Sequence, residues 1–287
     1  MFGLLIAMLG VIVLIPSAVV AILVIQIRTV NRTVPVADQP PPRIEGLIGR
    51  RFPGAPLRLA VLGDSFAAGY GAAKPRETVG FLLATALSRQ ARRRVLLTRQ
   101  AVVGAMSGHL AHQVEAALRH TPEVAVIYIG GNDVTRFAPL AKSARELGEA
   151  VSRLRSAGSH VIVGTCPDLR VLPPLHPPLS WLAAWRSSRL ARAQTTAVTA
   201  AGGHPIPLAR LLNPYFAADP VRMFGADRFH PSADGYARTA AISLPPMLAA
   251  LRTEGLLPAH TPDPAVRQPI VSLARPGAGS APPPDQR

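Results

Sequence analysis

The sequence predicts a three-layer α/β fold, in which one parallel sheet is covered by helices on both faces. Apolar runs recur along the chain at about 58–62, 94–98, 124–129, 160–164 and 205–209. Stretches typical of helices lie between them at about 78–91, 108–119, 140–157 and 181–201, and a last one follows at about 233–252. Strands that alternate with helices favour a parallel sheet, because each parallel connection needs a crossover. Five strands in about 200 residues fit a single domain.

An apolar stretch without charged residues precedes this pattern, from about Leu4 to Ile27. About 22 helical residues span roughly 33 Å, which is enough to cross the hydrocarbon core of a bilayer. A cleaved signal peptide is the alternative. However, no Lys or Arg precedes the run, and the run is longer than the apolar part of a usual signal peptide. We therefore expect a transmembrane helix with short flanks over residues 1–30.

Positive charge follows the apolar stretch, at Arg28, Arg32, Arg43, Arg50 and Arg51. The positive-inside rule places such a flank in the cytoplasm. A single span followed by a bulky domain can break this rule, so an extracytoplasmic domain is the alternative. We expect a single-pass membrane protein whose folded domain lies on the cytoplasmic side.

Two proline-rich segments border the predicted domain. Residues 31–56 predict a juxtamembrane linker that holds the domain off the bilayer. Residues 253–287 are rich in Pro, Ala and Gly with little apolar periodicity, which predicts a disordered tail. The domain itself then covers residues 57–252.

The composition narrows the function classes. Lys and Arg outnumber Asp and Glu by 31 to 16, which gives a net charge of +15. The basic residues are scattered and aromatic residues are sparse, which argues against a nucleic-acid surface. Cys166 is the single cysteine, so an internal disulfide is excluded. The scattered histidines form no metal-ligand pattern and there is no phosphate-binding Gly-rich loop, so we expect no metal and no cofactor. The oligomeric state is not predicted.

The first apolar run of the domain ends in Gly-Asp-Ser-Phe at residues 63–66. Ligands of open parallel sheets bind at the carboxyl ends of the strands, so Ser65 stands where a nucleophile can act. Taken alone, such a serine is more often the N-cap of a helix. The choice depends on whether a base and an oxyanion site lie nearby.

Two further motifs follow predicted strands. Residues 130–133 read Gly-Gly-Asn-Asp, and the amide of Asn132 is a neutral donor that can face a developing oxyanion. An Asx turn that closes the strand is the alternative. Gly104 follows the second strand at the same edge of the sheet, and its backbone N–H can be a second oxyanion donor. An ordinary loop glycine is the alternative there.

The last motif, Asp-Arg-Phe-His-Pro-Ser at residues 227–232, precedes the final helix. A catalytic serine needs a base, and the base needs a partner that fixes its tautomer. Asp227 and His230 stand three residues apart and can hydrogen-bond, while the other imidazole nitrogen faces outward. A surface or core histidine is the alternative. Ser232 is a candidate N-cap for the helix that follows.

Together these motifs resemble those of the SGNH hydrolase superfamily, the GDSL-type lipases and esterases. Residues 63–66 are similar to the block that carries the nucleophile, and Gly104 to the glycine of the second block. Residues 130–133 are similar to the third block, and Asp227 with His230 to the fifth. The four blocks keep the family's order and cover about residues 57–252. The family fold implied is a flavodoxin-like α/β/α sandwich with a five-stranded parallel sheet.

The sequence departs from the family pattern at two places. Phe66 stands where the family's common name has a leucine, which concerns packing rather than chemistry. Gln100 stands near a position where the family often has an asparagine, so the block around Gly104 is the loosest match.

The resemblance implies a serine hydrolase that uses no cofactor. Ser65 would attack the carbonyl of an ester, with His230 as general base and Asp227 orienting the imidazole. The N–H groups of Ser65 and Gly104 and the side chain of Asn132 would form the oxyanion hole. The interpretation is a membrane-anchored esterase that acts on a lipid or small-molecule carboxylic ester through an acyl-enzyme. Two alternatives stay open: an acyltransferase or carbohydrate deacetylase of the cell envelope with the same triad, and a catalytically silent membrane-tethered binding protein.

Both tryptophans of the chain lie in the helix predicted at 181–201. Trp181 and Trp185 are four residues apart and so share one helix face. Packing of this face onto the sheet is one interpretation. The other is an acyl-binding lip that faces the membrane, with arginines near the lipid headgroups.

Overall fold

The computed structural model describes residues 2–33 and 40–257, with the side chains of the first helix described from residue 14 on except those of 31 and 33. Six strands form one sheet over these residues, in the order β1-β3-β2-β4-β5-β6. The strands are β1 (Gly46–Ile48), β2 (Leu57–Gly63), β3 (Val95–Arg99), β4 (Val124–Tyr128), β5 (His160–Gly164) and β6 (His204–Ile206). Strands β2 to β6 are parallel and correspond to the five predicted from the sequence.

The sixth strand, β1, was not predicted. It pairs antiparallel with β3 and lies within residues 31–56, which the sequence analysis interpreted as a linker. Its three residues, Gly-Leu-Ile, are too short to give an apolar run. Pairing with β3 rather than its own hydrophobic pattern therefore defines it.

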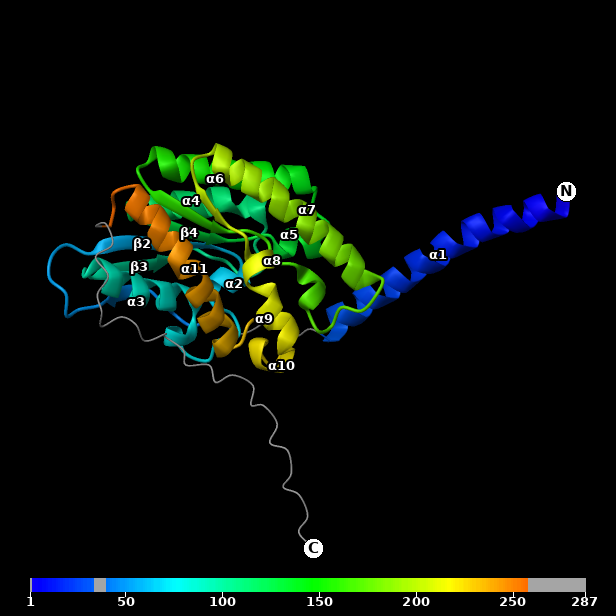
Figure 1. Ribbon diagram of the computed structural model, residues 1–287, viewed down its shortest axis with the longest axis horizontal. Coiled ribbons are helices and arrows are strands. Elements are labelled where there is room, and N and C mark those ends of the chain that lie inside the picture. Colours follow the sequence, from blue (N-terminus) through cyan, green and yellow to red (C-terminus); the bar gives the residue numbers. More distant parts are fainter. Residues whose placement is uncertain (1, 34–39, 258–287) are drawn as a thin grey trace, which may run out of the picture.

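Helices cover both faces of the sheet (Figure 1). The long ones are α3 (Val79–Ala91), α4 (Leu110–Leu118), α6 (Leu140–Ser156), α7 (Leu179–Ala200) and α11 (Ala233–Thr253). Short ones lie at the strand ends: α2 (Ser65–Ala68), α5 (Gly131–Thr135), α8 (Leu208–Leu211), α9 (Asn213–Ala218) and α10 (Pro220–Met223). Successive strand residues point to opposite faces, which divides the core in two. In β2, Leu59 and Val61 belong to the cluster with α3 and α11, whereas Ala60 and Leu62 belong to the cluster with α4 and α6.

The strand order places a natural crevice between β2 and β4. From β2 the chain first adds β3 on one side and then returns to add β4 on the other. The connections that leave β2 and β4 therefore diverge, and ligands of such sheets bind where they part. We call the edge where the parallel strands end the carboxyl edge.

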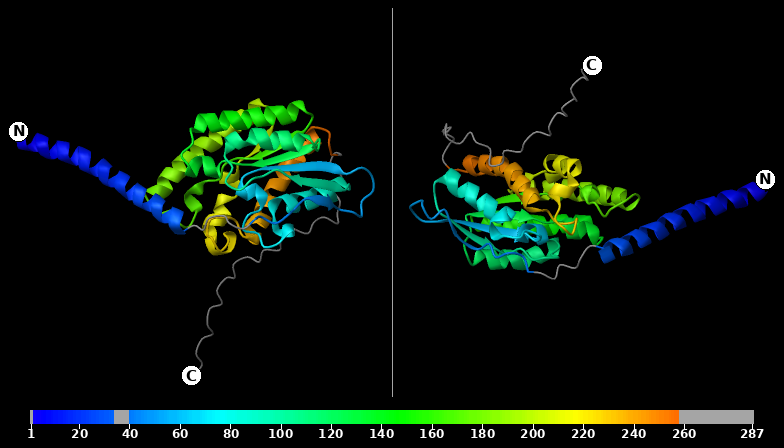
Figure 2. Two further views of the ribbon diagram at one scale, coloured as in Figure 1. Left: turned by 180° about the vertical axis from the view of Figure 1, so that it is seen from behind. Right: turned by 90° about the horizontal axis from the view of Figure 1, so that it is seen from below.

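A long helix, α1 (Phe2–Thr33), projects away from the α/β domain (Figures 1 and 2). Gln26 attaches it to the turn before α7: its Nε2 donates to the carbonyl of Pro177 (2.8 Å), and the N–H of Leu179 donates to its Oε1 (3.2 Å). Among the described residues, no helix has an apolar stretch long enough to cross a membrane. The side chains of residues 1–13, where the predicted transmembrane segment begins, lie outside the described part, as do residues 34–39 of the predicted linker and residues 258–287 of the predicted tail. The first residues of that predicted tail, 253–257, instead belong to the folded domain, where Leu257 is buried.

A carboxylate at the end of α11 joins the last helix to the rest of the domain. Glu254 accepts hydrogen bonds from Arg155 of α6 (2.5 Å), from His160 of β5 and from His204 of β6. Burial alone would raise the pKa of this carboxyl. The hydrogen bonds from His204, Arg155 and His160 outweigh burial and lower the pKa to about 2.

We expect Glu254→Gln to lower the free energy of unfolding at neutral pH by about 1.5–3 kcal/mol, the range for hydrogen bonds to a charged group. Because the folded pKa lies below the unfolded value of 4.5, the stabilisation is present above that value and is lost as the pH falls through about 2. Urea unfolding at neutral pH and near pH 3 checks this. Glu149→Gln, at an exposed position of α6, is the control with little effect. A deficit that stays the same at both pH values would contradict the prediction.

Candidate active site

Ser65 lies at the carboxyl edge because β2 and β4 approach each other closely at Gly63. The backbone of Gly63 has a φ of +132°, and a Cβ there would lie 1.8 Å from the carbonyl oxygen of Tyr128. Only glycine fits this position. Asp64 is the N-cap of α2 and accepts from the N–H of Phe66 (2.9 Å), so Ser65 is the first helical residue and not the cap.

The structure brings together the three side chains predicted as a triad. The hydroxyl of Ser65 lies 2.9 Å from Nε2 of His230, and Nδ1 of His230 lies 2.6 Å from the Asp227 carboxylate. The second oxygen of Asp227 accepts from the N–H groups of Phe229 and His230, both at 3.0 Å. Burial alone would raise the pKa of Asp227, but the bonds from His230 and these N–H groups lower it. Asp227 is therefore held as a carboxylate that orients the imidazole.

The loop that carries His230 is fixed from several sides. The backbone carbonyl of His230 accepts from the N–H of Gly225 (2.8 Å). The centroid of the Tyr70 ring lies 4.6 Å from the centroid of the imidazole. Ser232 caps α11 as predicted, accepting from the N–H of Gly235 (3.1 Å). The hydroxyl of Tyr236 in α11 donates to the carbonyl of Tyr70 (2.7 Å). The imidazole is thus positioned before any substrate binds.

The predicted oxyanion donors lie on neighbouring segments. The amide of Asn132, in α5, donates to the carbonyl of Ala105 (3.0 Å). An amide nitrogen carries two hydrogens, so this bond orients the side chain and leaves one hydrogen to donate. Asp133 accepts from the N–H of Ser107 (3.1 Å) and holds the same loop in place. Gly104, with a φ of +79°, lies in this loop but not in the lining of the cavity described next.

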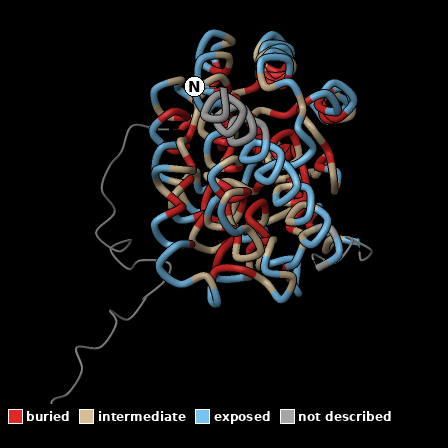
Figure 3. Tube along the Cα trace, turned by 90° about the vertical axis from the view of Figure 1, so that its right-hand side faces the viewer, coloured by how far each residue is buried: buried red, intermediate tan, exposed pale blue. Residues whose placement is uncertain are grey.

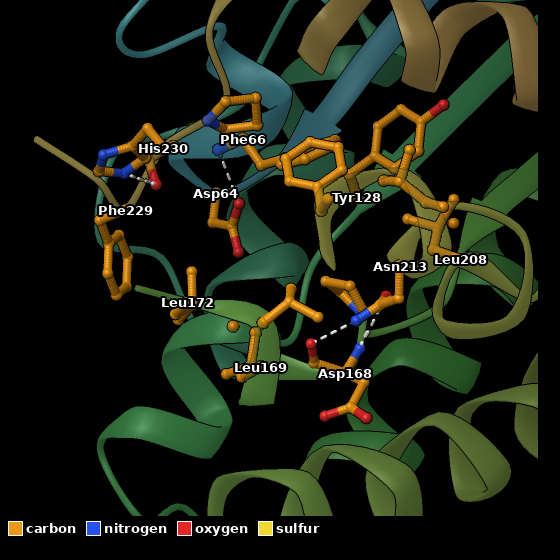
Figure 4. Close-up of a pocket in the computed structure, with 18 of the residues that line it drawn as sticks. Asp64, Phe66, Tyr128, Asp168, Leu169, Leu172, Leu208, Asn213, Phe229 and His230 are labelled. Atoms are coloured by element: carbon orange, nitrogen blue, oxygen red, sulfur yellow. Dashed lines mark hydrogen bonds between the residues drawn. The ribbon is translucent and has the colours of Figure 1, made fainter. Parts of the chain in front are cut away.

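A cavity of about 100 Å³ opens beside Ser65, Asn132 and His230 (Figure 4). Its lining is mainly apolar and includes Phe66, Tyr128, Leu169, Leu172, Leu208, Leu212, Phe216, Phe224 and Phe229. Figure 4 shows His230 at one end and Leu208 with Tyr128 at the other. Two bonds between Asp168 and Asn213 tie the walls together, one at 3.2 Å and one at 2.5 Å.

Two buried glutamines hold the strand ends and were missed in the sequence analysis. Gln113 of α4 pairs with both backbone groups of Gly63, at 2.7 and 2.9 Å. Gln194 of α7 accepts from the N–H of Cys166 (2.7 Å) and donates to the carbonyl of Ile129 (3.1 Å). The sequence signal that could have revealed them is a polar residue within the apolar stripe of a predicted helix. Gln113 follows Leu110 by three positions, and both are buried.

Other residues considered from the sequence lie apart from the chemistry. Cys166 is buried, and burial raises the pKa of its thiol, which keeps it neutral. Trp181 and Trp185 are exposed, so the interpretation that this helix face packs onto the sheet is wrong, and neither side chain lines the cavity beside Ser65. Within the part of the chain that the structure describes, no group of three His, Cys, Asp or Glu side chains could hold a metal ion.

Comparison with known proteins identifies the relatives of this arrangement. Residues 61–238 match the model of the GDSL-like lipase/acylhydrolase family. The chain is 42% identical over 252 residues to the GDSL-like esterase Rv1075c of Mycobacterium tuberculosis, which covers 83% of this chain and 80% of that protein.

Solved structures with the same SGNH hydrolase fold are more distant in sequence. A lipase/acylhydrolase from Enterococcus faecalis is 21% identical with a TM-score of 0.54. The match covers 71% of this chain and 99% of the Enterococcus chain. A catalytic mutant of Axe2, an acetylxylan esterase from Geobacillus stearothermophilus, is 16% identical with a TM-score of 0.55. The match covers 68% of this chain and 95% of the Axe2 chain. At these identities the likeness establishes the fold.

The carboxyl group of Asp64 is unusual for a side chain next to a candidate nucleophile. It is 5% exposed, and burial raises its pKa from 3.8 to about 7. The N–H of Phe66 and the charge of nearby His230 act against this rise, whereas Asp133 adds to it. The carboxyl therefore changes charge near neutral pH in the folded state.

Asp64→Asn should become more stable relative to the wild type as the pH rises. Because the folded pKa lies above the unfolded one, the contribution of Asp64 is fully present below about pH 3.8 and is lost as the pH rises through about 7. Asparagine keeps the acceptor for Phe66 and does not titrate. Melting temperatures of both proteins between pH 5 and pH 8, compared in matched buffers, measure the difference, and a constant difference would refute the shift.

Proposed function

Because the chain belongs to the GDSL-like lipase/acylhydrolase family and is an esterase of that family, we propose that it is a membrane-attached serine esterase for carboxylic esters with apolar acyl groups. The observation that carries the mechanism is the hydrogen-bonded series from Ser65 through His230 to Asp227. The observation that carries the substrate class is the apolar cavity beside it.

In this proposal the reaction begins with attack of the Ser65 oxygen on the carbonyl carbon of the ester. His230 Nε2 takes the hydroxyl proton, and Asp227 stabilises the imidazolium that forms. The negative charge moves to the former carbonyl oxygen, where the N–H of Ser65 and the amide of Asn132 donate to it. Gly104, which the family resemblance assigns as a further N–H donor, lies outside the lining of the cavity and is not needed for these two bonds. One such donor typically contributes on the order of 100- to 1000-fold in rate.

The tetrahedral intermediate then collapses to an acyl-enzyme, which water hydrolyses in a second stage. The bond between carbon and the alcohol oxygen breaks, and His230 gives its proton to the leaving alcohol. An acyl group remains on Ser65. A water molecule next gives a proton to His230 and attacks the acyl carbon. The bond from this carbon to the Ser65 oxygen then breaks, and His230 returns its proton to that oxygen, which releases the carboxylic acid and restores the serine.

The cavity favours an acyl chain longer than acetyl as the group bound there. Its lining is dominated by aromatic and aliphatic side chains, and burial of a methylene on such a surface contributes about 0.8 kcal/mol. A carbohydrate would need several polar partners along its bound length. Deacetylation of an envelope carbohydrate and acyl transfer to another acceptor remain the alternative outcomes of a substrate panel.

Membrane attachment is the part of the proposal that rests on the sequence. Residues 4–27 carry no charge, and arginines follow at 28 and 32. This supports an N-terminal anchor with the esterase domain on the cytoplasmic side. The exposed aliphatic side chains of the described part of α1 are consistent with a nonaqueous environment.

Ser65→Ala should abolish labelling by a fluorophosphonate probe and lower kcat for a soluble p-nitrophenyl ester by about 10⁴- to 10⁶-fold, the usual cost of losing a triad nucleophile. Cys166→Ser is the matched control and should label as the wild type does, because the buried thiol is not the nucleophile. Gel fluorescence and ester kinetics measure both. Labelling that persists in Ser65→Ala would remove Ser65 from its assigned role.

Leu208→Phe should shift the acyl preference toward shorter chains. The larger ring occupies the end of the cavity away from His230 (Figure 4). Displacing two methylenes forfeits about 1.6 kcal/mol, so kcat/KM for long acyl chains should fall roughly tenfold relative to acetyl. The volume-conserving Leu208→Met should leave the profile unchanged. A uniform loss over acetyl, butyryl and octanoyl esters would show that the cavity does not hold the acyl chain.

A further inference from the structure

The exposed stripe of α7 changes from aromatic to basic along the helix. Trp181 and Trp185 are 64% and 54% exposed, one helical turn apart. Arg189 follows one turn later with its guanidinium 5.0 Å from the Trp185 ring, and Arg192 is exposed after that. The helix contains no Asp or Glu. Large exposed indoles beside basic side chains on a helix without acidic residues are uncommon on a surface that meets only water.

Helix α1 meets α7 at the aromatic end of this stripe. Gln26 bonds to Pro177 and Leu179, directly before the two tryptophans. Ile27 and Val30 of α1 line a small apolar cavity together with residues of α5 and α7. The body of α1 that leads away from this contact exposes Leu14, Ile15, Val19, Val20, Ile22, Val24 and Ile25. Figure 3 shows the described part of α1 exposed, in contrast to the buried strands.

The contact lies on the carboxyl edge of the sheet. Helix α7 begins after the loop that leaves β5, and the α5 residues in the apolar cavity follow β4. Because parallel strands end at one edge, this contact and Ser65 lie on the same side of the domain. Figure 1 shows α1 leaving the domain on the side where the strands end.

We propose that the exposed face of α1 and the side chains of Trp181 and Trp185 form one surface that contacts a lipid bilayer with anionic headgroups. The indoles lie at the boundary between headgroups and acyl chains, where tryptophan is favoured. Arg189 and Arg192 lie farther from α1 along the helix, at the level of the phosphates, where each basic residue adds attraction. We call this the bilayer surface.

The bilayer surface turns the carboxyl edge of the sheet toward the membrane. An ester that resides in the bilayer then reaches Ser65 without crossing the whole domain through water. The inference depends on the proposed membrane attachment of the esterase, but not on its acyl-enzyme chemistry. It names the source of the substrate as a lipid ester in the same bilayer.

Tryptophan fluorescence tests the proposal directly, because these two residues are the only tryptophans in the chain. The full-length protein is reconstituted into vesicles of phosphatidylglycerol and phosphatidylcholine in equal parts, with brominated or unbrominated acyl chains. Trp181→Phe and Trp185→Phe each leave one reporter at an exposed position. We expect both reporters to lose emission in brominated lipid, and to lose less in vesicles of phosphatidylcholine alone.

A matched control places the reporter at the opposite edge of the sheet. Arg119 follows α4, before β4, and its side chain is 72% exposed. Arg119→Trp, combined with Trp181→Phe and Trp185→Phe, should keep its emission in brominated lipid. Equal loss from this control would mean that the domain has no preferred orientation, and the proposal would fail.

Two further readouts separate this proposal from the proposed function. Flotation with the vesicles but no quenching of either tryptophan would overturn the bilayer surface and leave the membrane anchor intact. Full turnover of a soluble ester without flotation would overturn both the surface and the anchor but not the esterase. Quenching in a protein that hydrolyses no ester would support the surface and count against the proposed function.

Discussion

The structure depends on the close approach of two strand ends, β2 and β4. Gly63 meets the carbonyl of Tyr128 with no room for a Cβ, and the N–H of Asp64 donates to that carbonyl at 3.1 Å. Gln113, from the helix layer, accepts from the N–H of Gly63 and donates to its carbonyl. This contact sets where α2 begins and hence where the Ser65 hydroxyl points. A side chain at Gly63 would force the strands apart at the crevice in which the site is built.

Electrostatics of the site follow from the same packing. Asp64 and Asp133 are buried and interact with each other, whereas Asp227 is only half-buried. Asp133 and Asp227 accept backbone N–H groups, and Asp227 also accepts from the imidazole of His230. For Asp64, burial outweighs the hydrogen bond from the N–H of Phe66 and raises the pKa. The charge needed for catalysis is thus concentrated on the carboxylate that orients the base.

The sequence predicted the five parallel strands, because each is a buried apolar run followed by a helix. It also predicted Ser65, Asn132, Asp227 and His230 at one edge, because chain order and strand polarity determine which loops meet. The strand β1 could not be predicted, since it exists only through its pairing with β3. The glutamine supports were missed for a similar reason: a polar residue on a helix stripe does not reveal which backbone group it reaches.

The same topology would couple the proposed membrane attachment to catalysis. The segments that follow β4 and β5 both start at the carboxyl edge. The first carries Asn132, and the second carries the turn to which Gln26 of α1 hydrogen-bonds. A helix docked to that turn cannot be placed at the opposite edge without breaking the contact. In the proposed attachment, orientation toward the bilayer therefore requires no second domain. This orientation needs only an exposed end of α7 that is compatible with lipid. Trp181 and Trp185, followed along the helix by arginines, satisfy this condition.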